Sequence, residues 1–452
     1  MMRGGLILGA MVVAGCAEGP PATVGGERLA LAWNVFEDGS RQLETGEVRD
    51  LARGERCTPR RWRDGATYCT PGGRDAAGLV TVYADASCDE PALRAVDGGA
   101  RAYALTLEGG AVTALHRTAP LALDAFWARD AAGACLGPYP GSGQRFYRRG
   151  AEVPVGALAP MGTEVIEGGG RVGLRAHTSP DGLRLPHALR DTSHGFDCIV
   201  RTTASGVATC LPPRQAALRF ADATCREPVV GQHELWPDVA PYVFAGAVCS
   251  PQGFVIGTEL PAAPGYELVD GACRATAAPV GHRWFQAAPI ELARVERRRL
   301  AAPGHRLQAI ELVAGDLALV DRPRFDTGTG GECVLASSAA EPGVRRCLPQ
   351  DPGYEHTYYT DAACTRPVPL ANVFREAPMA KCGADLPPFA VAADRPGVYF
   401  RITDSRTEPV YRRDESGACT AAPYESLAGT PMVFELGEPV LASEFVAVQR
   451  AE

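Results

Sequence analysis

The sequence predicts an all-β protein built from three repeats of about 140 residues each. The first observation is the phrase FADATCREPV at Phe220, which recurs in related form as VYADASCDEP at Val82 and YTDAACTRPV at Tyr359. The second is a content of 51 glycines and 37 prolines, which is typical of many turns and few long helices. The third is a series of β-rich segments, such as RLALAW, PYVFAG and GVYFRI, that lie between turn residues.

Cysteines and turn residues follow the same repeat. Two cysteines precede each copy of the phrase, and the first of them has an aspartate seven positions earlier and a glycine three positions earlier. The three sets are Asp50, Gly54, Cys57 and Cys69; Asp191, Gly195, Cys198 and Cys210; and Asp326, Gly330, Cys333 and Cys347. A polar turn also recurs upstream, at Asp38-Gly39, Asp181-Gly182 and Gly315-Asp316. We therefore place the repeats at residues 28–169, 170–304 and 305–449.

Each repeat is expected to divide into two sheet modules. The hairpin cysteines Cys88, Cys225 and Cys364 have weaker counterparts, which also follow an aromatic strand and an Asp/Gly turn, at Cys135, Cys273 and Cys419. Six modules of about 70 residues arranged in a ring predict a six-bladed β-propeller, which protects its sheet edges by radial repetition. The alternative is three β-sandwich domains in tandem. Helical periodicity never persists beyond about fifteen residues, so PIELARVERRRLAA, from Pro289, is expected to be strand and loop.

The N-terminus, MMRGGLILGAMVVAGC, carries one arginine and a short apolar run before Cys16. This pattern predicts a secretory signal peptide at residues 1–15, which is too short for a membrane span of about 20 residues. The motif Val13-Ala14-Gly15-Cys16 resembles the lipobox of bacterial lipoproteins. That resemblance implies acylation of Cys16, attachment to a membrane and a place in the cell envelope, and Ala17 favours the outer membrane. The alternative is an ordinary signal peptide with an incidental cysteine. Residues 16–27 are expected to be a flexible tether.

Charge and cysteine content restrict the partners and the compartment. The net charge of -8 makes nucleic acid an unsuitable partner. Fifteen cysteines in an exported chain indicate disulfides, and setting Cys16 aside leaves an even number. No two cysteines have the C-x2-C or C-x4-C spacing of a zinc site, so disulfides explain the cysteines better than a metal does.

The two cysteines before each phrase flank a strand–turn–strand segment, where opposed residues of an antiparallel pair suit a disulfide. We therefore expect the pairs Cys57–Cys69, Cys198–Cys210 and Cys333–Cys347, each worth about 3 kcal/mol on the loop-entropy model. The other pairings stay open. One possibility is Cys225–Cys249 with Cys364–Cys382, and the other is Cys249–Cys273 with Cys382–Cys419. The first repeat has only Cys88 and Cys135 left.

Several motifs point to chemistry, but a structural interpretation explains each of them better. PRFDTGTGG, around Asp326, resembles the Asp-Thr-Gly loop of aspartic proteases, yet no second such loop occurs, so we expect a turn-forming aspartate. The histidines His177, His187 and His194 are expected in solvated loops, and the run Arg297-Arg298-Arg299 on a solvated face. A calcium-binding ring is a further hypothesis for the hairpin aspartates, although turn chemistry also explains them. These aspartates are Asp85, Asp130, Asp222, Asp270, Asp361 and Asp414.

The D-x6-C spacing, the RCLP motif at Arg346 and the Asp-Ala-x-Cys hairpin resemble a group of cysteine-rich repeat lipoproteins of high-GC bacteria. That resemblance implies no catalytic residues, and we expect no cofactor. We therefore expect a lipid-anchored, non-catalytic envelope module that has a structural role or binds envelope polysaccharide or surface proteins. The alternative is an exported hydrolase or lyase on a propeller scaffold, which requires repeat-breaking residues such as Asp197, His194 and Glu259 to converge.

Overall fold

The computed structural model describes residues 23–451, apart from gaps at 73–78, 96–101, 203–206, 237, 247–249, 262–263, 270, 338–340, 342–343, 351, 373–387, 393–394, 396, 414–416 and 423–432. Within these ranges the chain forms β-strands, two single-turn 3₁₀ helices and no α-helix. The predicted all-β class is therefore confirmed. The same order of elements occurs three times along the chain.

The first part of each repeat is an antiparallel meander, which we call the inner meander. Its strands are β1 (Leu29–Phe36), β2 (Arg41–Asp50), β3 (Glu55–Arg61) and β4 (Thr67–Pro71); then β13 (Val172–Thr178), β14 (Arg184–Asp191), β15 (Phe196–Asp197), β16 (Ile199–Thr202) and β17 (Ala208–Leu211); then β26 (Leu307–Ala314), β27 (Leu317–Asp326), β28 (Gly331–Ser337) and β29 (Arg345–Pro349). Glycines with positive φ shape the turn between the first two strands of each meander, because only glycine adopts this conformation without strain. They are Gly39 (φ 78°), Gly182 (φ 98°) and Gly315 (φ 63°).

One further strand of each repeat returns from its second part to the meander. These return strands are β12 (Ala159–Ile166), β25 (Arg294–Leu300) and β37 (Val448–Ala451), and the 3₁₀ turns η2 (Val155–Ala157) and η3 (Ala442–Glu444) precede the first and the last. Strand β12 lies between β4 and β13, and β25 lies between β17 and β26. Strand β37 pairs with β1, and the two residues just before it meet β29: the Cys347 amide donates to the Val446 carbonyl at 2.9 Å, and Ala447 bridges to Arg346. The three inner meanders therefore form one closed ring of strands.

Each junction between neighbouring repeats has a hydrophobic core to which both contribute. Buried side chains that meet in this way are Leu29 and Val48 with Leu183 and Leu185; Val172 and Leu189 with Leu312 and Leu319; and Phe36 with Leu307 and Val446. Burying one such side chain contributes about 1.5–3 kcal/mol. Because every repeat contributes to the cores on both of its sides, the inner meanders stabilise one another.

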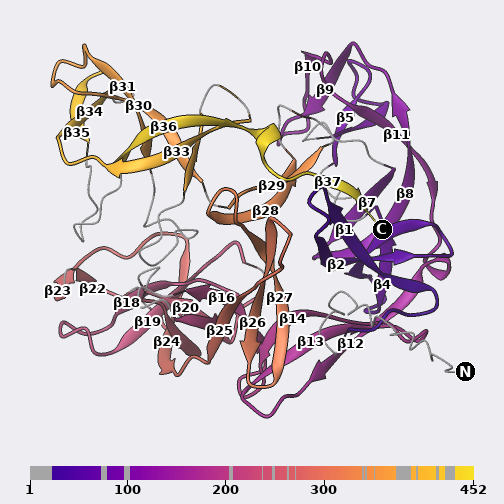
Figure 1. Ribbon diagram of the computed structural model, residues 1–452, viewed down its shortest axis with the longest axis horizontal. Coiled ribbons are helices and arrows are strands. Elements are labelled where there is room, and N and C mark those ends of the chain that lie inside the picture. Colours follow the sequence, from indigo (N-terminus) through magenta and orange to yellow (C-terminus); the bar gives the residue numbers. More distant parts are fainter. Residues whose placement is uncertain are drawn as a thin grey trace, which may run out of the picture.

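The second part of each repeat is an outer sheet. Its strands are β5 (Leu79–Tyr83), β6 (Pro91–Ala95), β7 (Tyr103–Glu108), β8 (Ala111–Leu121), β9 (Ala125–Arg129), β10 (Cys135–Pro140) and β11 (Phe146–Glu152); then β18 (Ala217–Phe220), β19 (Pro228–His233), β20 (Tyr242–Ala245), β21 (Gln252–Glu259), β22 (Tyr266–Val269), β23 (Ala272–Ala275) and β24 (His282–Ile290); then β30 (Gly353–Tyr359), β31 (Pro367–Asn372), β32 (Phe389–Val391), β33 (Val398–Ser405), β34 (Val410–Arg413), β35 (Cys419–Ala422) and β36 (Val433–Leu441). In the third repeat β30 also pairs in parallel with β32, so that β30-β31-β36-β33-β32 closes into a small barrel. Figure 1 shows the outer sheets at three separate places around the inner strands.

The six-bladed propeller is not confirmed, because the modules do not form six separate blades. The inner strands run continuously from one repeat into the next, and only the outer sheets stand apart. The hairpins that carry Cys135, Cys273 and Cys419 belong to the same outer sheets as the first hairpin cysteines and do not define second modules. Tandem sandwiches do not describe the chain either, since the inner cores are shared between repeats. The segment from Pro289 is strand and loop, as predicted, and forms the end of β24 and the whole of β25.

Candidate functional site

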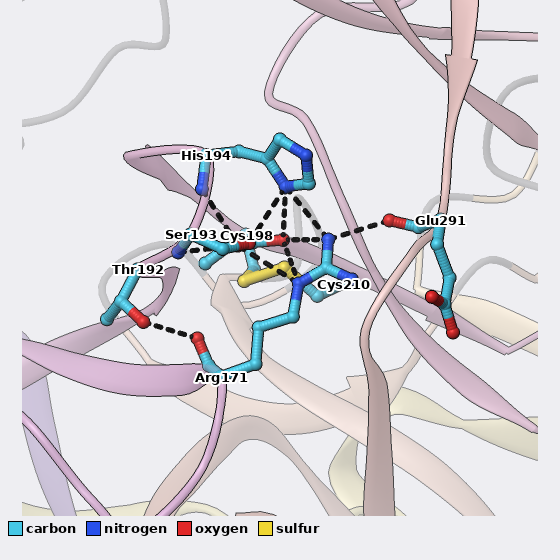
Figure 2. Close-up of polar contacts among 8 residues, drawn as sticks. Arg171, Thr192, Ser193, His194, Cys198, Cys210 and Glu291 are labelled. Carbon is cyan, nitrogen blue, oxygen red and sulfur yellow. Dashed lines mark hydrogen bonds and ion pairs between the residues drawn. A yellow bond between two sulfur atoms is a disulfide. The ribbon is translucent and has the colours of Figure 1, made fainter.

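The aspartate that recurs seven positions before a cysteine is completely buried in all three repeats. In the second repeat Asp191 ends β14, and its carboxylate accepts hydrogen bonds from the Ser193 amide at 3.1 Å and from the Ser193 hydroxyl at 2.6 Å. Arg171, which directly precedes β13, donates to the same carboxylate from Nε at 3.1 Å and from Nη2 at 2.6 Å (Figure 2). Nη2 of Arg171 also donates to the Glu291 carbonyl at 2.7 Å, just before the return strand β25. One partly buried ion pair therefore fastens three segments of the second repeat.

The same set of contacts, which we call the Arg–Asp lock, occurs in every repeat. Its members are Arg28 with Asp50 and the Ala157 carbonyl, Arg171 with Asp191 and the Glu291 carbonyl, and Arg306 with Asp326 and the Glu444 carbonyl. In each lock the glycine four residues after the aspartate has positive φ and donates its amide to the aspartate carbonyl at 2.7–2.8 Å. The aspartates were predicted from the sequence, whereas the arginines were missed. A signal for the arginines is present, because an arginine followed by leucine or valine occurs 20 to 22 residues before each aspartate.

A second set of aspartates links each repeat to the next. Asp181, in the β13–β14 turn, accepts the amides of Arg28 and Leu29 at 2.6 and 2.8 Å. Asp38, in the β1–β2 turn, accepts the Leu307 amide at 2.7 Å. Asp316, in the β26–β27 turn, accepts the Gly169 amide at 3.1 Å. The second repeat thus caps the first, the first caps the third, and the third caps Gly169, in the segment that leads from the first repeat into β13 of the second.

The second repeat adds Ser193 and His194 (Figure 2) to its lock, and their contacts with Asp191 bring a serine, a histidine and an aspartate together. Their geometry does not fit nucleophilic catalysis. The Ser193 hydroxyl donates to Asp191 rather than to the histidine, and Arg171, which can only donate, lies 2.8 Å from Nδ1 of His194. In a Ser-His-Asp triad the aspartate and the serine use different ring nitrogens, whereas here Asp191 and Ser193 both face Nδ1, at 3.2 and 3.1 Å. This cluster is an Arg–Asp lock with an added histidine.

Burial would raise the pKa of Asp191, but hydrogen bonds from Arg171, Ser193 and His194 outweigh it and lower the pKa to about 2. The carboxylate therefore stays ionised at neutral pH and cannot act as an acid. Asp326 of the Asp-Thr-Gly sequence occupies the equivalent place in the third repeat, with its carboxylate bound to Arg306 at 2.6 and 2.8 Å. The prediction of a structural aspartate at this motif agrees with these contacts.

The hairpin aspartates of the outer sheets also stabilise the turns in which they lie, by accepting hydrogen bonds from backbone amides. Asp222 accepts the amides of Thr224, Arg226 and Glu227 at 2.8–3.1 Å, and Asp85 and Asp361 accept equivalent amides. Hydrogen bonds, first of all from the Ser87 hydroxyl, lower the pKa of Asp85 to about 2. The equivalent turns lie on three separate outer sheets, and among the described residues no three acidic, histidine or cysteine side chains gather to hold a metal. Asp270 and Asp414 lie outside the described residues.

Six disulfides join described cysteines. They are Cys57–Cys69, Cys198–Cys210 and Cys333–Cys347 in the inner meanders, and Cys88–Cys135, Cys225–Cys273 and Cys364–Cys419 in the outer sheets. The first three are the predicted pairs. Both open alternatives for the outer cysteines are wrong, because each hairpin cysteine pairs with its later counterpart, while Cys249 and Cys382 lie outside the described residues, as does Cys16. The three hairpin cysteines have φ of 53–56°, and this left-handed conformation directs each side chain toward its partner strand.

The other residues that the sequence singled out do not gather in one place. Asp197 pairs with Arg175 at 2.5 Å and Arg190 at 2.8 Å, His194 belongs to the lock, and Glu259 pairs with Arg283 on an outer sheet. Nothing in these contacts favours the hydrolase or lyase alternative. The arginine run is not simply solvated: Arg297 binds Asp321 and Glu332, Arg298 binds Glu311 at 3.0 Å, and Arg299 lies over the Phe325 ring. His177 and His187 lie on strands rather than in loops, because β13 and β14 extend through both positions.

The fold and these contacts define a class of protein: an all-β repeat protein whose charged and cysteine residues staple its scaffold. Within that class, the chain belongs to a family of unknown function, DUF7481, which matches residues 8–429. No curated protein matches the chain. Its many disulfides indicate an extracellular or envelope protein that matures in an oxidising compartment. Among the described residues, no helix has the length and apolar character needed to cross a bilayer.

Proposed function

We propose that the protein is a lipoprotein of the cell envelope, held by acylation of Cys16, with a non-catalytic β-repeat module that binds envelope polysaccharide or surface proteins or supports the envelope structurally. The observation that carries this proposal is that the charged residues that recur in every repeat, the aspartates of the Arg–Asp locks, hold the scaffold together. In all three repeats the buried aspartate of the Arg–Asp lock binds an arginine of the scaffold through its carboxylate. A triplicated scaffold of this kind suits a stable display surface. Acylated Cys16, which follows the signal peptide at residues 1–15, supplies the anchor.

The point at which the chain first joins the folded module limits how far that module can lie from the membrane anchor at Cys16. Val24 exchanges two backbone hydrogen bonds of 2.8 Å with Arg184 at the start of β14. At about 3.4 Å per residue, the stretch from Cys16 to Val24 spans at most about 27 Å. An acylated Cys16 would therefore keep the second inner meander close to the membrane and leave the outer sheets to meet partners.

Replacement of the acylated cysteine tests the anchor. Cells that express the Cys16→Ser variant should release the protein from the membrane fraction and should fail to incorporate labelled palmitate into it, whereas the wild type and a neighbouring Ala17→Ser control should retain both properties. Protease shaving of intact cells then gives the location. Peptides from residues 28–452 that are released by shaving would place the module on the surface and direct the search to glycans and surface proteins. A Cys16→Ser variant that remains membrane-bound and labelled would overturn the proposal.

A further inference from the structure

Two apolar side chains protrude at one end of the second outer sheet. Val280 is 93% exposed and Leu235 is 83% exposed, whereas the other exposed large apolar side chains of the described residues are at most 53% exposed. Single apolar residues are ordinary on a protein surface, but nearly fully exposed ones that lie together indicate a surface that contacts something other than water. We call Leu235, Trp236 and Val280 the apolar tip.

Backbone contacts bring the members of the apolar tip together. Leu235 follows the end of β19 and Val280 precedes the start of β24, and these two strands pair along their length. The pairing continues into the tip, since the Glu234 amide donates to the Gly281 carbonyl at 2.9 Å. Gly281 has φ of 74°, so the chain changes direction between Val280 and β24. The ends of two neighbouring strands therefore present both apolar side chains at one place.

Trp236 lies directly behind these side chains. Its amide donates to the His233 carbonyl at 3.0 Å in the turn that ends β19, and the residue is partly exposed. The Arg214 guanidinium lies over the indole at 5.4 Å and donates from Nη1 to the Asp238 carbonyl at 2.7 Å. Tryptophan is enriched at the boundary between lipid and water, and arginine binds phosphate groups. This pair therefore suits the headgroup layer of a bilayer.

The repeat shows that the scaffold does not require these apolar residues. The first outer sheet has the same order of strands as the second. Ser142, which directly precedes GQRFY, stands there at the place of Val280, which directly precedes GHRWF. Gly98 stands at the place of Leu235, since each follows the hairpin aspartate of its repeat by 13 residues. A sheet of this kind forms with polar or small residues at both places, so the fold does not explain the apolar tip.

We propose that the apolar tip inserts into the lipid surface of the membrane that holds the protein, as a second contact beside the anchor at Cys16. The insertion needs only the tip, whereas its place beside an anchor rests on the proposed function. Val24 bonds to Arg184 of the second repeat, the repeat that carries the tip, and the stretch from Cys16 to Val24 spans at most about 27 Å. Attachment makes the second contact intramolecular, so a weak contact is sufficient. Insertion turns the second outer sheet to the membrane and leaves the first and third free for partners.

The size and surroundings of the tip favour a bilayer over a protein partner. A stable protein interface takes about 20–30 residues from each side, whereas the apolar tip is a group of three. Charged residues adjoin it: Glu234 directly precedes Leu235, and Arg283, near the start of β24, pairs with Glu259 at 2.5 Å. Because these charges include both signs, insertion should depend on apolar burial and not on the charge of the headgroups.

Cosedimentation with phosphatidylcholine vesicles tests the proposal on the mature chain, residues 16–452, without acyl groups. We expect binding at lipid concentrations on the order of 1 mM, unchanged between about 0.1 M and about 0.5 M salt. Leu235→Ser and Val280→Ser should each weaken it about tenfold, since each removes the burial of one apolar side chain. Brominated lipid should quench tryptophan fluorescence in the wild type, and less so in Trp236→Phe. The matched control is Leu107→Ser with Leu441→Ser, two leucines that are 50% and 53% exposed in the other repeats.

The control should bind the vesicles as the wild type does. A wild-type chain that does not bind, equal binding by Leu235→Ser with Val280→Ser, or binding that requires anionic lipid and disappears in high salt would each overturn the proposal. A dimer in solution that this double variant abolishes would assign the tip to a second copy of the chain instead. Vesicle binding by a chain that cells do not acylate would reject the anchor and keep the tip, whereas acylation without vesicle binding would reject the tip alone.

Discussion

Substitution of Asp191 by asparagine should remove the charge from the lock of the second repeat while it keeps the shape of the side chain. The wild-type carboxylate is completely buried and binds Arg171 at 2.6 Å. In the variant the Arg171 side chain, which is 27% exposed, loses its counter-charge but keeps the Glu291 carbonyl as an acceptor. Breaking a fully buried pair costs about 3–5 kcal/mol, and the partial exposure of the arginine reduces this cost. We expect a loss of about 2–3 kcal/mol in the free energy of unfolding.

The lowered pKa of Asp191 gives a second value for the free-energy contribution of the same contacts. A fall from 3.8 to about 2 corresponds to about 2 kcal/mol at neutral pH, after allowance for solvent screening. Because the folded pKa is the lower one, this stability is fully present above about pH 4 and is lost as the pH falls toward 2. The difference between wild type and Asp191→Asn should therefore be largest at pH 7 and nearly absent at pH 2.

Calorimetry and circular dichroism at both pH values measure this difference. With an unfolding entropy of about 2.1 cal/mol/K per residue, cooperative unfolding of the whole chain converts 2–3 kcal/mol into a fall in Tm of about 2–3 °C at pH 7. Asp89→Asn is the control, because Asp89 is exposed and its side chain has no partner among the described residues. If Asp191→Asn unfolds at the same temperature as this control, or if its loss of stability is equally large at pH 2, the Asp191 carboxylate does not stabilise the fold through its charge.

Three further substitutions test the turns and the staples. Asp181→Ala removes the acceptor of the Arg28 and Leu29 amides, so it should cost about 1–2 kcal/mol and speed hydrogen exchange of those two amides; unchanged exchange would contradict the capping contact. Gly54→Ala places a side chain at φ 69° with open space around it, so only backbone strain of about 1 kcal/mol should appear in the unfolding free energy, whereas Gly156→Ala, at ordinary φ, should cost less. The double variant Cys225→Ser with Cys273→Ser removes a disulfide that closes a loop of 48 residues, so the free energy of unfolding should fall by up to about 4 kcal/mol. Limited proteolysis should then cut the β22–β23 hairpin first. Resistance to proteolysis equal to that of the wild type would argue against a stapling role.

The sequence alone determined the all-β class, the inner-meander disulfides and the structural role of the repeated aspartates. These features depend on local chemistry: strand propensity, the left-handed preference of glycine, and two cysteines on the neighbouring strands of a single hairpin. Cys57 and Cys69 are diagonal neighbours rather than the directly opposed residues that the sequence predicted, because Cys57 lies opposite Pro71 and Cys69 lies opposite Pro59. Local chemistry is encoded within a few residues, so repetition along the chain was enough to reveal it.

Only the tertiary structure decided how the repeats meet. Strand β12 could pair with its own repeat, with the next one or with both. The choice depends on contacts between residues far apart in sequence, which no local sequence pattern predicts. The same holds for Cys225, which has cysteines available at 24 and 48 residues and bonds to the farther one because the pairing of β18 with β22 brings Cys273 next to it. His187 lies over His177 because of a bulge, which a register read from sequence spacing does not include. Pairing between distant strands determines these features, and the folded chain alone fixes that pairing.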